Sequence, residues 1–246
     1  MSNLDPLKKP REVGQAHRLG RLLARPAVTP RPLAAFGPGT HALRLGGRRD
    51  ALLVVPDGLD LDRAAPLAIV FHDAGGTARE AVDLLAAAAA AQGVLLLAPE
   101  ARGPTWDFIL TTFGPDVSFL DEALAETFAR LRVDPDRVAA AGFSDGASYA
   151  LTLGMANGDL FSHVLAFSPG FAAPLSQHGA PRLFVAHGTG DEVLPIDRAS
   201  RKIVPRLTRA GYAVTYREFV GGHVVPPEIA TAALTWMLTT RVVVPH

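Results

Sequence analysis

The chain of 246 residues contains no cysteine, carries no net charge and has no long apolar run. Without cysteine it forms no disulfide, binds no metal through thiolates and uses no cysteine as a nucleophile. Lys+Arg and Asp+Glu number 24 each, so the chain lacks the excess of positive charge that attracts a nucleic-acid backbone. Any nucleophile is therefore an oxygen atom, and we expect no nucleic-acid partner.

The apolar segments are too short to cross a membrane. The longest candidate, residues 84–98, is interrupted by Gln92 and Gly93 and falls short of the roughly 20 apolar residues that a span needs. The N-terminus also lacks the apolar run of a secretory signal. We therefore expect no integral membrane association and a cytoplasmic location.

The first 36 residues differ in composition from the rest of the chain. Residues 1–36 hold seven Arg or Lys, two acidic residues and five prolines, so we expect a basic, Pro-rich extension outside the core. Apolar residues recur there near helical spacing, at Val13, Ala16, Leu19, Leu22 and Leu23. A helix lying on the domain or a partly ordered tail is favoured over a helix that binds a membrane surface.

From residue 41 onward, short apolar runs alternate with longer segments of helical pattern, which is typical of repeated βα units. We expect eight strands, at residues 41–45, 51–55, 67–71, 94–98, 138–143, 163–167, 183–186 and 214–219. We expect helices at about residues 78–92, 117–131, 146–157, 198–210 and 226–239. No helix separates the first three strands, so the sheet should begin antiparallel and continue parallel within one α/β domain.

The pentapeptide Gly142-Phe143-Ser144-Asp145-Gly146 joins an apolar strand to a helix rich in small residues. A serine on such a tight turn has its hydroxyl pushed out above the sheet, and flanking glycines leave room for the strained backbone. The helix N-terminus behind the serine favours developing negative charge. The pattern G-x-S-x-G alone also marks ordinary turns, but its place between strand and helix predicts that Ser144 is a nucleophile.

A serine nucleophile needs a base, usually histidine, and a carboxylate that holds the tautomer of that histidine. In the chain order serine, acid, histidine, only His223 and His246 follow the plausible acids, and His246 is the last residue. His223 follows the last expected strand, after two glycines that allow its loop to bend back toward the serine. By elimination, His223 is the expected base.

The acid is expected in the loop after the seventh strand, which contains Asp191, Glu192 and Asp197. Asp191 is favoured because Glu192 would point the other way from a fixed loop, and Asp197 is more simply a helix cap. Asp159 precedes the sixth strand and lies at the far edge of the sheet. The sequence therefore predicts Asp191 as the acid, with Asp197 as the next alternative.

The oxyanion of a tetrahedral intermediate needs donors, typically two backbone N–H groups. One donor is expected from Asp145, the residue after the serine, and the other from the glycine-containing loop after the third strand, where we choose Ala74. The neighbouring His72 and Asp73 have no further ligand at metal spacing, so a structural role is favoured and no metal or cofactor is expected.

These motifs, in their order and spacing, resemble the α/β-hydrolase fold, and within it the phospholipase/carboxylesterase branch with its polyhydroxybutyrate-depolymerase-like esterases. The resemblance covers about residues 40–240. It implies a mostly parallel sheet of about eight strands with helices on both faces, and a catalytic domain at 37–246.

Carried over residue by residue, the resemblance implies the following roles: Ser144 as nucleophile, Asp191 as acid, His223 as base, and the amides of Ala74 and Asp145 as the oxyanion hole. The sequence departs from the family at one point, because the usual His-Gly pair of the oxyanion loop is here His72-Asp73. A side chain at position 73 can reshape the loop, so the assignment of Ala74 is less secure than those of Ser144, Asp191 and His223.

The connection between the sixth and seventh strands, residues 168–182, is too short for the cap that lipases acting on aggregated lipid usually carry. We therefore expect no large cap domain and an open pocket for short-chain or aryl esters. Trp106 and Phe108 follow the fourth strand on the same rim and are candidate substrate-binding residues, with ordinary packing as the alternative.

The favoured function is a serine carboxylester hydrolase that acts on a small-molecule ester through an acyl-enzyme. An amide- or peptide-cleaving relative shares the same chemistry and stays open. A non-catalytic ligand-binding protein is the third alternative. The sequence does not decide the oligomeric state, and a homodimer stays open.

Overall fold

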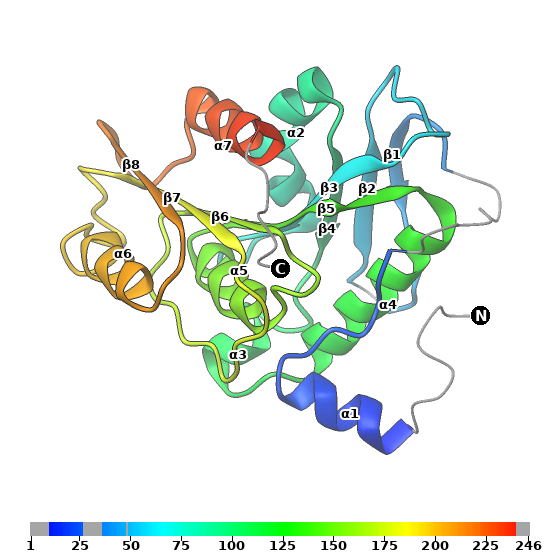
Figure 1. The fold of residues 1–246 in the computed structure, drawn as a ribbon, viewed down its shortest axis with the longest axis horizontal. Helices are drawn as coiled ribbons and strands as arrows, with labels where there is room; N and C mark the ends of the chain where they lie inside the picture. Colours follow the sequence, from blue (N-terminus) through cyan, green and yellow to red (C-terminus); the bar gives the residue numbers. More distant parts are fainter. Residues whose placement is uncertain (1–9, 27–35, 48, 240–246) are drawn as a thin grey trace.

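The computed structural model describes residues 10–26, 36–47 and 49–239 (Figure 1). Its centre is an eight-stranded sheet with the strand order β1-β2-β4-β3-β5-β6-β7-β8. The strands are β1 (Gly39–Ala42), β2 (Ala51–Val55), β3 (Ala65–Phe71), β4 (Leu95–Pro99), β5 (Val133–Phe143), β6 (His163–Phe167), β7 (Arg182–Gly188) and β8 (Val214–Phe219). β1 pairs antiparallel with β2, and β2 with β4, whereas the remaining neighbours are parallel, as predicted.

The helices are α1 (Pro10–Arg18), α2 (Ala78–Gln92), α3 (Asp107–Leu110), α4 (Pro115–Arg130), α5 (Asp145–Ala156), α6 (Ser200–Arg209) and α7 (Pro227–Thr239). The local sequence sets their ends: Thr77 and Glu80 form a capping box before α2, and Gly93 ends this helix at a φ of 66°. The sequence predicted these helices apart from α3 and the bounds of α1.

Each strand sends alternate side chains to opposite faces of the sheet. In β3, Leu67, Ile69 and Phe71 belong to one core cluster, and Ala68 and Val70 belong to the other. The helices α4, α5 and α6 cover the first face, and α2 and α7 cover the second (Figure 1). This layering places the loops that follow the parallel strands together at the carboxyl edge of the sheet, where α/β folds bind their ligands.

No cap interrupts this edge in the described part of the chain. Residues 168–181, between β6 and β7, contain no helix. This connection is held against α5, because Gly170 N–H donates to Ser148 Oγ at 2.9 Å and Ala173 N–H donates to Thr152 Oγ1 at 3.3 Å. Among the described residues, no helix is both long and apolar enough to cross a membrane.

Part of the N-terminal segment packs into the molecule. Leu22 and Ala24 are fully buried in the core cluster that also contains α4 and α5. His17 Nε2 lies 2.9 Å from Asp121 Oδ2, and Ala24 N–H donates to Asp121 Oδ1 at 2.8 Å. The expectation that no core residue precedes position 37 is thus wrong for these two side chains, while the division of the chain into two domains at residue 36 stays a prediction.

Candidate active site

Ser144 stands on a strained turn between β5 and α5. Its φ of 56° and ψ of −119° lie in a region that a non-glycine residue rarely adopts. Its N–H donates to Phe167 O at 3.0 Å, and its side chain is nearly buried. The strain is maintained by the strand on one side and the helix on the other, which is the geometry that the G-x-S-x-G context predicted.

The two glycines of this turn are required by close backbone approach. A Cβ at Gly142 would overlap the backbone of Gly146, and a Cβ at Gly146 would overlap the carbonyl of Phe71 at the end of β3. The turn therefore packs directly on the start of the loop that contains Ala74.

Asp191 lies in the loop after β7 with its side chain buried. Its Oδ1 accepts hydrogen bonds from Val193 N–H at 3.0 Å and Leu194 N–H at 2.8 Å, and its Oδ2 lies 2.7 Å from His223 Nδ1. Burial alone would raise the pKa of Asp191, but the hydrogen bonds from His223 and Leu194 outweigh it and hold the pKa below its ordinary value. The carboxylate is thus kept ionised and fixed in orientation.

His223 receives its orientation from this carboxylate. An ionised carboxylate only accepts hydrogen bonds, so His223 donates from Nδ1 and keeps Nε2 free to accept a proton. The imidazole lies beside the Phe143 ring, with the ring centroids 4.5 Å apart. His223 is therefore held next to the residue that precedes Ser144.

Glycines also bring the loop of Asp191 against the loop of His223. Gly190 N–H donates to Gly221 O at 2.8 Å, and a Cβ at Gly188 would overlap the carbonyl of Gly222. The loop after β7 and the loop after β8 thus support one another.

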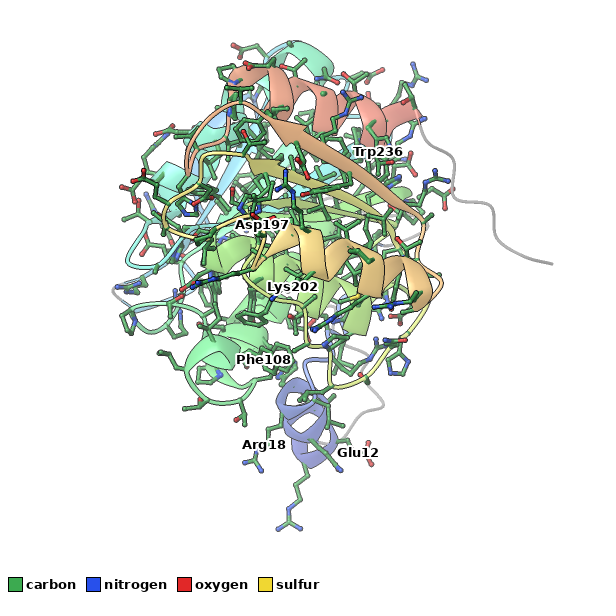
Figure 2. The ribbon with its side chains drawn as sticks, turned by 90° about the vertical axis from the view of Figure 1, so that its left-hand side faces the viewer. Glu12, Arg18, Phe108, Asp197, Lys202 and Trp236 are labelled. Carbon is green, nitrogen blue, oxygen red and sulfur yellow. The ribbon has the colours of Figure 1, made fainter. Side chains whose placement is uncertain are left out.

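The alternative acids lie elsewhere. Asp197 is exposed beside α6, where Figure 2 labels it, and it pairs with Arg201 at 2.9 Å. Asp159 pairs with Arg21 at 2.7 Å, and Glu192 is exposed. The alternative base His246 lies outside the described residues.

The loop after β3 is held by His72. Its Nδ1–H donates to Asp73 O at 2.6 Å and its Nε2 accepts from Ala101 N–H at 3.0 Å, which requires a neutral ring. Burial lowers the pKa of His72, in agreement with this neutral state. His72 therefore has the structural role that the sequence favoured.

The amides of this loop are partly engaged. Gly75 N–H donates to Pro104 O at 2.7 Å and Gly76 N–H donates to Asp73 O at 3.1 Å. Ala74, at the exposed tip of the same loop, is the residue chosen from the sequence. Its role as a donor stays a prediction.

The loop after β4 joins the turn of Ser144 to the loop that carries Ala74. Thr105 Oγ1–H donates to Asp145 Oδ2 at 2.9 Å, so the Asp145 side chain is turned toward this loop. Trp106 donates its indole N–H to His72 O at 2.9 Å and is only 1% exposed. This burial supports the packing alternative for Trp106 over a place in the wall of the pocket.

Phe108 is only half-buried and belongs to an aromatic cluster at the rim. Its ring stacks on Phe113 with centroids 4.4 Å apart, and it lies 6.4 Å from Phe171 in the β6–β7 connection. Figure 2 shows Phe108 on α3, at the side of the molecule that faces α1. Phe108 thus retains the exposed surface that a substrate-binding residue needs.

The sequence did not single out two polar residues that hold the site. Ser148, one turn into α5, accepts the amide of Gly170, and the buried His187 at the end of β7 lies next to Asp191. The available signal for His187 was a histidine at the end of an otherwise apolar buried strand. Among the described residues, no group of three or more His, Asp or Glu side chains could hold a metal ion.

Comparisons with known proteins find relatives that are named esterases. A family model described as "Putative esterase" matches residues 115–204. "Putative esterase NocK" from Nocardia uniformis subsp. tsuyamanensis is similar at 32% identity over 186 residues, which cover 70% of this chain and 54% of the relative. "Probable feruloyl esterase C" from Aspergillus clavatus is similar at 28% identity over 193 residues, which cover 72% of this chain and 70% of the relative.

A solved structure extends the likeness to the fold. The crystal structure of S-formylglutathione hydrolase FrmB from Staphylococcus aureus matches with a TM-score of 0.67 at 13% identity, covering 85% of this chain and 100% of the other. The chain spans about half of the length of NocK, 54%. The comparisons therefore give the fold and the kind of relative, and the chemistry must be argued from the site.

Proposed function

We propose that this chain, which is similar to esterases in sequence and fold, is a serine carboxylester hydrolase of the α/β-hydrolase superfamily acting on short-chain or aryl esters. The observation that carries the proposal is the 2.7 Å contact between Asp191 Oδ2 and His223 Nδ1. The imidazole of His223 also lies against Phe143, the residue that precedes Ser144 on its strained turn. This arrangement supplies a nucleophile, a base and a group that orients the base.

In the proposed mechanism, Ser144 Oγ attacks the ester carbonyl carbon while its proton passes to Nε2 of His223. The tetrahedral intermediate collapses, the bond to the alcohol breaks, and the imidazolium of His223 gives its proton to the leaving alkoxide. Water then attacks the acyl-enzyme, with His223 as the base, and releases the acid and the free serine. Asp191 stabilises the imidazolium in both halves of the reaction and stays ionised throughout.

The oxyanion requires donors on the other side of the carbonyl. We assign the backbone amides of Ala74 and Asp145 to this role, since the turn of Ser144 packs on the start of the loop that carries Ala74. Asp145 is the first residue of α5, so the positive end of the helix dipole adds to its amide.

The substrate preference follows from the open rim. The β6–β7 connection provides no cap, so little apolar wall would cover a long acyl chain. Burial of one methylene contributes roughly 0.8 kcal/mol to binding, and a methylene that stays in water contributes almost none of it. Phe108 and Phe171, which are both only partly buried, offer aromatic surface for a planar acyl group. A relative named as a feruloyl esterase supports the inclusion of aryl esters.

The test is hydrolysis of nitrophenyl esters of increasing acyl length, with methyl ferulate and a nitroanilide of the same acyl group. We expect kcat/KM to be highest at about two to four acyl carbons and to fall by about eight, without a rise in rate when the substrate aggregates. Faster cleavage of the anilide than of its ester would favour the amide-cleaving alternative. Binding without turnover of any substrate would favour the non-catalytic one.

Activity should also survive a chelator, because the proposed mechanism uses no metal and no cofactor. Loss of activity in EDTA with recovery on adding zinc would contradict it. The cytoplasmic location and the homodimer considered from the sequence stay predictions.

A further inference from the structure

A second histidine, His187, contacts the carboxylate of Asp191. It is the penultimate residue of β7 and its side chain is fully buried. Its Nε2 lies 3.1 Å from Asp191 Oδ2 and 2.8 Å from Leu194 O, and its Nδ1 lies 2.7 Å from Ser200 Oγ. The proposed mechanism assigns no role to this ring.

The partners fix the tautomer of His187. Both groups that face Nε2 are acceptors, so Nε2 carries the proton and shares it between Leu194 O and Asp191 Oδ2. Nδ1 then has only a lone pair, and it accepts the hydroxyl proton of Ser200. Burial lowers the pKa of His187, which agrees with a neutral ring.

The contacts of His187 reach both ends of the loop that carries the acid. The loop begins after Gly188, the residue that follows His187, and Leu194, whose carbonyl His187 binds, donates its own N–H to Asp191 Oδ1. The other charged or titratable groups facing His187 are His223 and Glu218, the latter its register partner on β8. Asp191 Oδ2 is therefore contacted by two imidazoles, through Nε2 of His187 and Nδ1 of His223.

We propose that His187 is a positioning residue that holds the Asp191 carboxylate and its loop in place for His223, with Ser200 fixing the required tautomer. This inference rests on the proposed function. Four N–H groups then surround the carboxylate, from Val193, Leu194, His187 and His223. Without the donor from His187, the carboxylate can rotate away from His223, and the imidazole loses the fixed orientation that proton transfer requires.

The two amide variants of His187 separate this role from simple packing. The amide of His187→Gln reaches the place of Nε2 and can still donate to Leu194 and Asp191. The amide of His187→Asn reaches only the place of Nδ1, where it can accept from Ser200 but cannot reach Asp191. Both variants are neutral and polar, so they form a matched pair.

We expect His187→Asn to lower kcat for a short nitrophenyl ester by about 10- to 100-fold, with KM changed by less than about twofold. We expect His187→Gln to keep kcat within about fivefold of the unchanged protein. Equal kcat losses in the two variants, or full kcat in a folded His187→Asn variant, would overturn the inference.

A double-mutant cycle covers the case in which His187→Asn folds poorly. If His187 acts through Asp191, then adding Ser200→Ala to Asp191→Asn should change the rate at which a fluorophosphonate probe phosphonylates Ser144, with loss of fluoride, by less than about twofold. In the protein with Asp191 unchanged, Ser200→Ala should lower that rate by about three- to tenfold. His187 Nδ1 then loses the hydroxyl that donates to it, and the tautomer of His187 is no longer fixed. Equal losses in both backgrounds would contradict the role.

The result for the unchanged protein separates this inference from the function it rests on. If the unchanged protein hydrolyses no ester and takes up no probe, the proposed function is wrong and the role of His187 falls with it. If it is active and His187→Asn is equally active, only the role of His187 is wrong.

Discussion

At the scale of single residues, the carboxylate of Asp191 determines which ring nitrogen of His223 carries the proton. Val193 and Leu194 donate N–H groups to Oδ1, so an Asn would place its oxygen there and its N–H₂ opposite His223 Nδ1. The imidazole then adopts the tautomer that is protonated at Nε2, and it cannot act as the base. We expect Asp191→Asn to lower kcat/KM by about 10³- to 10⁴-fold.

The matched control is Asp197→Asn, the alternative acid on the same segment. Asp197 is exposed and pairs only with Arg201 among the interactions described for it, so its replacement should change kcat/KM by less than about twofold. A larger loss for Asp197→Asn than for Asp191→Asn would move the role of the acid to Asp197.

The positions of Ser144, Asp191 and His223 were predictable from the sequence because each lies in a short glycine-containing segment at a strand end, in a set chain order. His187 was not predictable in the same way. In the sequence it is one polar residue in a buried strand, and its role depends on contacts with Asp191, Leu194 and Ser200 that only the folded loop creates.

At the scale of elements, the turn before α5 depends on the absence of a side chain at Gly146. A methyl group there would overlap the carbonyl of Phe71, and neither strand nor helix can shift without moving Ser144. We expect Gly146→Ala to lower the free energy of unfolding by at least about 2 kcal/mol and to abolish ester hydrolysis, measured by denaturant titration and initial rates.

Gly14 in α1 is the control for this substitution. Nothing lies within 4 Å of a Cβ built at this helical glycine, so Gly14→Ala should leave activity unchanged and raise stability by up to about 1 kcal/mol. Full activity in Gly146→Ala would contradict the claim that the turn has no room for a side chain at this position.

Two carboxylates, one buried (Asp116) and one half-buried (Asp107), cap each other's helices beside the site. Asp116 Oδ2 accepts from Asp107 N–H at 2.6 Å at the start of α3, and Asp107 Oδ2 accepts from Asp116 N–H at 3.0 Å at the start of α4. Burial and the neighbouring charge of Asp116 raise the pKa of Asp107 to about 6. The four-residue α3 depends on this pair, which is why helical periodicity did not predict it.

The raised pKa makes the contribution of Asp107 to stability dependent on pH. Between the ordinary aspartate pKa and about 6, the folded state keeps the proton that the unfolded state has lost, so stability falls as pH rises through this window. Compared with the unchanged protein, Asp107→Asn should gain about 1–2 kcal/mol in unfolding free energy from pH 4 to 7, after allowance for solvent screening. A constant difference across this range, measured by urea titration, would contradict the coupling.

At the scale of the whole molecule, the segment around Leu22 completes the core. Asp121 binds it through His17 and through the N–H of Ala24, and Arg21 pairs with Asp159 at the surface. Composition set this segment apart because proline and basic residues suggest an extension. The contacts that hold it join positions about a hundred residues apart, which composition cannot reveal.

This arrangement predicts unequal losses for two aspartates. Asp121→Ala leaves buried N–H groups without an acceptor, so it should lower the free energy of unfolding by about 2–4 kcal/mol. Asp159→Ala removes two half-exposed ion pairs, with Arg21 and Arg25, and should cost about 1 kcal/mol. Equal melting temperatures for the two variants would show that the segment is not part of the cooperative unit.

The antiparallel start of the sheet and its parallel continuation were predictable because the apolar runs are regular and the first three lack helices between them. The absence of a helix from the β6–β7 connection was predictable from the short length of that connection. The pairing of loops across the carboxyl edge was not, since it depends on backbone contacts between Gly188 and Gly222 that no periodicity encodes.

The claim that Ser144 is the acylated nucleophile is tested most directly by intact-mass analysis after treatment with a fluorophosphonate probe. The account predicts one adduct per chain, placed on Ser144 by peptide mapping, and no adduct in a Ser144→Ala variant with an unchanged melting temperature. Labelling that persists in Ser144→Ala would contradict it.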